Sequence, residues 1–366
     1  MFIIFFSCNL YAQTDSDKII SKQTVFGLEI HHGFIFAHSI YVQNTKDARP
    51  LGFEMEYAKL NTSPIVFQQY KCAAKSGWLF SYVDFNKQLL GKSYSASYFL
   101  EPVYRLSKPL SLHVRGVMGL SYLTNPFDSI TNKENQTYSL PVNFFLQLGL
   151  GLEYNLGPHL SLNTSANFFH NSNGGFAQPN RGINYPNISL GLKYYTISNK
   201  LPAFKKIIDT SWKKQSVKFD AGIIYSPKSG YDAQWKTQRK FLGGVMLQAG
   251  KQVSTMDNIT LATEVFYDGA MASIKNNLGD NSSSIRAGIL AGHEFLLNKF
   301  IFSQQLGVYI FKQTDYYNRV YNDDYRTLYH RWSLRYAFTP HIYAGVSLLA
   351  HAQIADFIDA RVLYRF

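Results

Sequence analysis

Apolar and polar positions alternate along the segment from Leu140 to Leu156. Every even-numbered position in this segment is apolar, whereas the odd-numbered positions are mostly polar or glycine. Side chains on a β-strand point alternately to its two faces, so the alternation predicts one strand with an apolar face and a wet face. A strand of this length is long for a globular protein and is typical of a tilted strand that crosses a membrane.

Similar segments recur along the chain, separated by clusters of Asn, Asp, Gly, Pro and Ser that are typical of turns. We expect eight strands in the first half, near residues 24–36, 50–60, 76–85, 93–106, 109–123, 138–156, 158–170 and 183–197. We expect eight more in the second half, near residues 215–225, 238–252, 258–268, 283–296, 299–312, 325–337, 340–350 and 355–366. The predicted fold class is therefore all-β, with the strands forming a transmembrane antiparallel β-barrel.

Residues 198–214 separate the two sets of strands. This segment lacks alternation, contains Pro202 and is rich in lysine, so it predicts a basic linker or a short helix. Periplasmic turns of outer-membrane barrels are short. A connector of this length favours an eight-stranded barrel over residues 24–197 and a second barrel-like unit over residues 215–366. The alternative is one larger barrel of about sixteen strands with an unusual turn.

The composition also favours a membrane barrel. Aromatic residues make up 16% of the chain, including 26 Tyr and 28 Phe, while charged residues make up only 16%. Tyrosine is enriched where a membrane barrel meets the lipid headgroups. Beyond the first residues, no apolar run approaches the ~20 residues of a transmembrane helix. Residues 1–12 resemble a short secretory signal peptide, and we expect the mature protein in the bacterial outer membrane.

The net charge of +12 suits a protein that lies among phosphorylated lipid headgroups. Neither a basic helix nor a mixed aromatic and basic motif points to nucleic acid. Cys8 lies in the signal segment, so Cys72 is alone in the mature chain and is expected to be inert. His31 and His32 are adjacent and would face opposite sides of a strand, and no zinc-like spacing occurs. We therefore expect no metal and no cofactor.

One segment carries side chains that can perform chemistry. His170 and Ser172 follow the strand near 158–170, and their spacing places them side by side on its apolar, lipid-facing side. A serine hydroxyl becomes a nucleophile when a neighbouring base takes its proton, and histidine is the usual base. If the first strand rises from the periplasm, this strand ends in the outer leaflet, where lipopolysaccharide resides.

At these residues the chain resembles the outer-membrane lipid A 3-O-deacylase family, also called acyloxyacyl hydrolases, over roughly residues 24–197. The family signature is His-x-Ser-Asn followed by another Asn seven residues on. It is matched here by His170, Ser172, Asn173 and Asn180. The resemblance implies that Ser172 is the nucleophile, that His170 is the general base, and that Asn173 and Asn180 stabilise the oxyanion. Three further fragments support it: Leu90–Ser93, Phe99–Pro102 and Gly119–Thr124.

The chain departs from the family at one position. The family has an acidic residue fourteen positions after the histidine, where this chain has Asn184. No Asp or Glu occurs between Glu153 and Asp209, and Glu101 lies on the polar face of another strand. Asn184 has lipid-facing parity, so we expect it to serve as the third catalytic residue and to orient His170. It brings no charge to stabilise the imidazolium.

The sequence and the resemblance together predict a serine esterase, a carboxylic ester hydrolase that removes an ester-linked acyl chain from lipid A. Its expected partners are lipid A and lipopolysaccharide in the outer membrane. Two alternatives stay open. The departure at Asn184 and the second half, which lacks the motif, favour a catalytically inactive structural or adhesive barrel, whereas one wide barrel would favour a passive pore. The sequence leaves the oligomeric state and the cleaved chain open.

Overall fold

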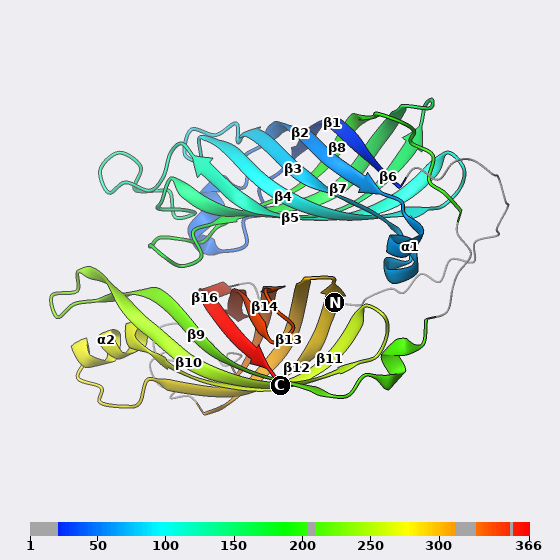
Figure 1. Cartoon of the computed structure of the whole chain (residues 1–366). Helices are drawn as coiled ribbons and strands as arrows, with labels where there is room; N and C mark the ends of the chain where they lie inside the picture. The colour runs from blue at the N-terminus through cyan, green and yellow to red at the C-terminus, as the bar shows by residue number, and fades with distance from the viewer. Residues whose placement is uncertain (1–20, 204–208, 312–326, 352–353) are drawn as a thin grey trace.

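The structure is a computed structural model that describes residues 21–203, 209–311, 327–351 and 354–366. The expected signal peptide, residues 1–12, lies outside the described residues. Figure 1 shows two β-barrels, one from each half of the chain. The strands of the described residues form two closed antiparallel barrels of eight strands each. The predicted fold class is confirmed, and the alternative of one barrel of about sixteen strands is wrong.

The first barrel contains β1 (Lys22–Gly33), β2 (Leu51–Asn61), β3 (Ala73–Asp84), β4 (Lys92–Arg105), β5 (Leu110–Leu123), β6 (Val142–Asn155), β7 (Leu160–Ser172) and β8 (Ile183–Tyr195). The second contains β9 (Lys218–Tyr231), β10 (Thr237–Gln252), β11 (Asp257–Asp268), β12 (Ile285–Leu297), β13 (Phe300–Phe311), β14 (Leu328–Ala337), β15 (Ile342–His351) and β16 (Ile354–Arg365). Each barrel closes by antiparallel pairing of its first and last strands, β1 with β8 and β9 with β16.

Within the described residues, four short helical segments lie between the strands: η1 (Ile40–Thr45), α1 (Pro64–Tyr70), η2 (Ser211–Lys214) and α2 (Gly269–Asn277). Helix α1 was not expected, although Ser63 caps its N-terminus and Pro64 occupies its first position, which are recognisable start signals. No helix of the described residues has the length and apolar character needed to cross a membrane.

The outer walls are apolar because the strands pair in a register that keeps like faces together. In β6 and β7, Leu148 pairs with Phe168 and Leu150 pairs with Ala166, and all four side chains face outward. The intervening residues are buried, as the alternating exposure of β7 shows. The alternation in the sequence therefore separates a lipid-facing wall from a polar interior.

The interior of the first barrel is filled by a buried network of charged side chains. Arg115 lies 2.5 Å from a Glu101 carboxylate oxygen and 2.6 Å from a Glu56 carboxylate oxygen. The Nζ of Lys75 lies 2.6 Å from the other Glu101 oxygen. Eight-stranded barrels have interiors just wide enough for side chains. The network also includes Glu29, Glu153 and Lys193.

The second barrel has a comparable interior built from different residues. Arg331 lies 2.5 Å from Asp359 and 3.1 Å from Glu264, and Arg361 lies 2.6 Å from Asp359. All four side chains are almost completely buried. Opposite charges paired at this depth satisfy one another in place of water. Ion pairs therefore occupy the centre of each barrel.

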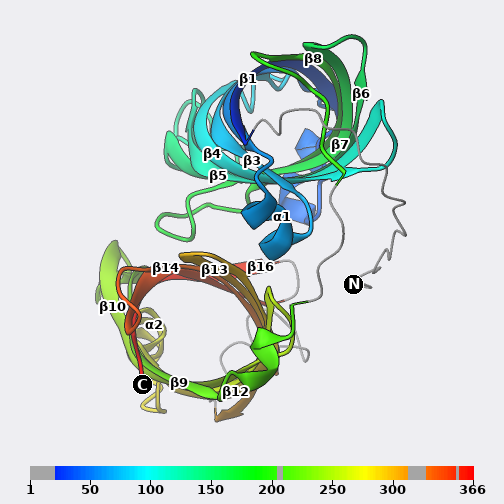
Figure 2. The ribbon, with the colours of Figure 1, turned by 45° about the vertical axis from the view of Figure 1, so that its right-hand side comes forward.

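Most of the long connections of the first barrel lie at one end. They are residues 34–50, 85–91, 124–141 and 173–182, and we call this end the loop end. The opposite end has the short turns 106–109 and 156–159 and the connection 62–72, which contains α1. Because outer-membrane barrels have long extracellular loops and short periplasmic turns, the loop end corresponds to the outside. Figures 1 and 2 show the two barrels side by side.

Candidate active site

Strand β7 carries His170 and Ser172 to the loop end of the first barrel. The Nε2 atom of His170 lies 3.0 Å from the Oγ atom of Ser172. Both residues continue the outward-facing parity of Phe168, as the spacing predicts. Ser172 is only 7% exposed, whereas His170 is half-buried. The structure thus brings the serine and the imidazole together on the lipid-facing side of the wall.

Asn184 lies directly opposite His170 across the pairing of β7 with β8. Its Oδ1 atom lies 2.6 Å from Nδ1 of His170. An amide oxygen only accepts hydrogen bonds, so this contact places the imidazole proton on Nδ1. The unprotonated Nε2 then faces the hydroxyl of Ser172. This is the arrangement that a general base needs.

A further side chain, absent from the sequence prediction, completes the chain of contacts. The Nδ2 atom of Asn184 lies 2.9 Å from Nδ1 of His38, in the loop that follows β1. Alternation cannot detect His38, because it lies outside any strand. Closure of the barrel explains the position of His38, because the pairing of β1 with β8 brings the residues after β1 beside Asn184.

Asn173 and Asn180 shape the loop that follows Ser172. The Oδ1 atom of Asn180 accepts the backbone N–H of Asn173 at 2.9 Å. The side chain of Asn173 is engaged at both ends: its Oδ1 accepts from the backbone N–H of Gly175, and its Nδ2 donates to the carbonyl of Ala177 and to Ser139. Asn173 directly follows Ser172, and its side chain is fully used in hydrogen bonds that hold the loop. Asn180 is bonded to the backbone of Asn173 through its side-chain oxygen.

An aromatic cluster lies on the opposite face of β7, inside the barrel. The ring of Phe169 packs edge-on against Phe145 and Tyr185, with centroids 5.2 and 5.4 Å away. The Tyr185 hydroxyl lies 2.9 Å from Nδ1 of His31. His31 is buried and His32 is exposed, so the two histidines face opposite sides, as expected. The cluster packs β7 against its neighbours directly behind the site.

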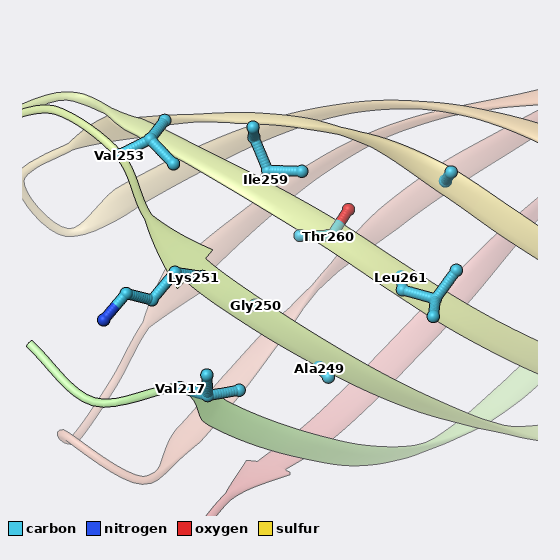
Figure 3. Close-up of a pocket in the computed structure, with 9 residues that line it drawn as sticks. Val217, Ala249, Gly250, Lys251, Val253, Ile259, Thr260 and Leu261 are labelled. Atoms are coloured by element: carbon cyan, nitrogen blue, oxygen red, sulfur yellow. The ribbon is translucent and has the colours of Figure 1, made fainter.

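Other features of the described residues do not contribute to this site. Glu101 points into the barrel, where it pairs with Lys75 and Arg115. No group of His, Cys, Asp or Glu in the described part of the chain could hold a metal ion. A concavity on the second barrel, drawn in Figure 3, is lined mainly by aliphatic residues such as Val217, Ile259 and Leu261, and it contains no nucleophile beside a base.

Two family models match the chain. Residues 57–193 match the model described as lipid A 3-O-deacylase (PagL), and residues 217–366 match acyloxyacyl hydrolase, C-terminal domain. Together the matches cover most of both barrels. The expected resemblance to the lipid A 3-O-deacylase (PagL) family is confirmed for the first barrel. The protein is one of the bacterial outer membrane, and the match supports lipid A deacylation as its activity.

The chain is also similar to solved structures, at low sequence identity. The outer membrane enzyme PagL aligns with a TM-score of 0.32 and 14% identity, covering 45% of this chain and 97% of its own. The attachment invasion locus protein Ail of Yersinia pestis aligns with a TM-score of 0.28 and 15% identity, covering 48% and 98%. The translocator domain of NalP from Neisseria meningitidis aligns with a TM-score of 0.24 and 9% identity, covering 94% and 88%. No curated protein matches the sequence.

Proposed function

We propose that this protein is a serine esterase that hydrolyses an ester-linked acyl chain of lipid A. Ser172 is the nucleophile, His170 is the general base, and Asn184 orients His170. The observation that carries the proposal is the continuous contact from Ser172 Oγ through His170 to Asn184 Oδ1, with distances of 3.0 and 2.6 Å. The catalytic unit is residues 24–197, and residues 215–366 form a second unit joined by the basic linker 198–214.

The reaction proceeds by acyl transfer to the serine. Ser172 Oγ attacks the ester carbonyl carbon while its proton moves to Nε2 of His170. The carbonyl oxygen becomes an oxyanion, and the NH2 group of Asn180 is a candidate donor to it, because the contact of Asn180 with Asn173 uses only its oxygen. The bond to the sugar oxygen then breaks, and that oxygen takes the proton from His170. A water molecule then attacks the acyl-serine while giving a proton to His170. The bond to Ser172 Oγ breaks, His170 returns the proton to that oxygen, and a fatty acid is released.

The surroundings of the site fit a substrate held in the bilayer. Below Ser172 on the outer wall lie Phe168, Leu148 and Ile188, and the last two are 63% and 61% exposed. An acyl chain lying along these side chains stays in an apolar environment while its ester reaches the level of Ser172. The loop end corresponds to the extracellular side, and lipid A occupies the leaflet on that side. Substrate access from the membrane therefore explains why the reactive pair faces outward.

Mass spectrometry of lipid A tests this proposal directly. Cells that make lipopolysaccharide are compared with and without the full-length protein and with the variants Ser172→Ala and His170→Ala. We expect one ester-linked acyl chain to be lost only with the active protein. Ser111→Ala, which alters a buried serine at the turn end of β5, serves as the matched control and retains activity. Unchanged lipid A in every sample supports the inactive barrel instead.

A further inference from the structure

His38 lies beside Asn184 because the backbone ladder between β1 and β8 continues beyond the end of β1. The N–H of Phe34 donates to the carbonyl oxygen of Pro186 at 3.2 Å, and the N–H of Phe36 donates to the carbonyl oxygen of Asn184 at 2.8 Å. The ring of His38 stacks on Phe36, with centroids 6.5 Å apart and planes 24° apart. The closure of the barrel therefore determines where the His38 ring lies.

The contact between His38 and Asn184 bears on the protonation of His170. An amide has an accepting end and a donating end of nearly the same shape. If the amide of Asn184 were turned round, its NH2 group would face Nδ1 of His170. The proton of His170 would then lie on Nε2, opposite Ser172, and the imidazole could not accept the serine proton. A carboxylate at this position would raise no such ambiguity, because both of its oxygens accept.

We propose that His38 is a positioning residue that selects the productive orientation of Asn184. The Nδ1 atom of His38 accepts the Nδ2 N–H of Asn184 at 2.9 Å, so the amide oxygen faces His170. The carbonyl oxygen of Phe36 is farther from the same Nδ1, at 3.4 Å, which is at the limit of a hydrogen bond. His38 thus supplies an acceptor that a chain with an acidic residue at position 184 does not need. The role in turnover rests on the proposed function.

A double-mutant cycle on the full-length protein tests this role. His38→Phe keeps an aromatic ring and removes the acceptor, and it is made in the native chain and in Asn184→Asp. We expect His38→Phe to lower kcat by about 10²- to 10⁴-fold in the native chain, the scale of a histidine held in the wrong tautomer, with KM nearly unchanged. In the Asn184→Asp protein the same change costs less than about threefold. His32→Phe, which alters an exposed neighbouring histidine, is the matched control.

Two results overturn the proposal. An equal loss of kcat in both backgrounds indicates a merely structural role for His38, and an unchanged kcat in the native chain indicates no role. A second measurement is independent of activity: ¹⁵N NMR of histidine-labelled protein in detergent micelles reports which nitrogen of His170 carries the proton. We expect Nδ1 in the native chain and a shift toward Nε2 in His38→Phe. If the native chain and Asn184→Asp both lack activity, the proposed function fails, and the NMR result alone decides the positioning role.

The loop after β7, residues 173–177, contacts the second barrel. The hydroxyl of Ser229 on β9 donates to the carbonyl oxygen of Phe176 at 2.5 Å. Arg239 on β10 donates to the same oxygen, and its guanidinium lies 5.6 Å from the centre of the Phe176 ring. A Cβ atom on Gly174 would lie 2.6 Å from the end of the Ile358 side chain of β16, and one on Gly175 would lie 3.1 Å from the carbonyl oxygen of Asp356.

We infer that the second barrel holds in place this loop, which begins directly after Ser172. The Phe176 ring also packs on Phe144 of β6, at 6.0 Å, so the loop is held from both barrels. Asn173, the residue that follows the nucleophile, hydrogen-bonds within the same loop. Small displacements of a catalytic group have large effects on rate, so a support at this place contributes to turnover. This assigns a role to a barrel that carries no second His-x-Ser-Asn motif.

Two measurements on the full-length protein test the support. The double variant Ser229→Ala with Arg239→Ala is expected to lower kcat by about tenfold or more. Lys236→Ala, at the tip of the same hairpin, is the control and leaves kcat unchanged. Cysteines placed at Phe176 and Ser229 are expected to be joined by a short bifunctional reagent within one molecule. Failure of the cross-link overturns the contact, and full activity of the double variant overturns its role.

Discussion

The Nδ1 atom of His170 lies 2.6 Å from the Oδ1 atom of Asn184, so an amide occupies the place where a carboxylate would stabilise the imidazolium. The amide reproduces the hydrogen bond but not the negative charge. The charge matters most in the transition state, when His170 has taken the proton from Ser172.

Asn184→Asp is therefore expected to raise the rate of lipid A deacylation. In serine hydrolases the reverse exchange, acid to amide, costs about 10⁴-fold in kcat, so we expect a gain of at least about tenfold. Initial rates on purified lipid A in detergent micelles measure it. The gain must disappear in the Ser172→Ala background. A loss of activity in Asn184→Asp would show that His170 depends on an uncharged partner.

Gly182→Ala is expected to inactivate the protein without unfolding it. Gly182 has a φ of +77°, and a Cβ atom there would lie 2.8 Å from Cε1 of His170. The added methyl group strains the backbone and displaces the imidazole. Gly279→Ala is the matched control, because Gly279 has a φ of +70° but open space around the position of a Cβ. Equal rates for the two variants would contradict the expectation; folding is checked by the gel shift of unheated samples.

Arg115→Met is expected to destabilise the first barrel. Arg115 is buried between Glu101 and Glu56, and its removal leaves these carboxylates with lysines such as Lys75 as their only cations and one buried negative charge more than before. Breaking a buried ion pair costs about 3–5 kcal/mol in the free energy of unfolding. Urea unfolding in detergent, followed by gel mobility, measures the change. The exposed pair between Lys92 and Asp84 offers the comparison, since Lys92→Met leaves the urea midpoint nearly unchanged.

Cys72 is expected to resist alkylation in the folded protein. Its side chain is 3% exposed, and burial raises the pKa of the thiol to about 12. The thiolate is the reactive form, so almost none is present near pH 8. Mass spectrometry after iodoacetamide treatment should show modification only after denaturation. Rapid labelling of the folded protein would mean that the thiol reaches solvent. A serine-to-cysteine variant at Ser129, which is exposed in the loop after β5, confirms that the reagent is active.

The protein is expected to form no steady ion channel. Buried ion pairs such as Arg115 with Glu101 and Arg331 with Asp359 occupy the interiors of the two narrow barrels. Planar lipid bilayers with the purified protein should therefore show baseline conductance. Steady, reproducible current steps would instead support the passive pore. A wide porin recorded in the same chamber serves as the positive control.

The sequence predicts the strands well because lipid and the polar interior impose opposite demands on alternate residues. The alternation from Leu140 to Leu156 therefore appears directly as the exposed and buried faces of β6. The number of barrels depends on which strands close the sheet, and periodicity says nothing about pairing between β1 and β8. The same pairing determines the place of His38. A residue outside any strand has no pattern, and only the closed barrel reveals its contact with Asn184.

The pairing of β1 with β8 also bears on how the molecule is assembled. Strand β8 closes the first barrel by pairing with β1, and the chain runs on from β8 to the strands of the second barrel. The second barrel closes between β9 and β16. Insertion of this polypeptide therefore requires two sheets to close, each on its own. The barrel that closes first stays covalently joined to a sheet whose edge strands are still unpaired.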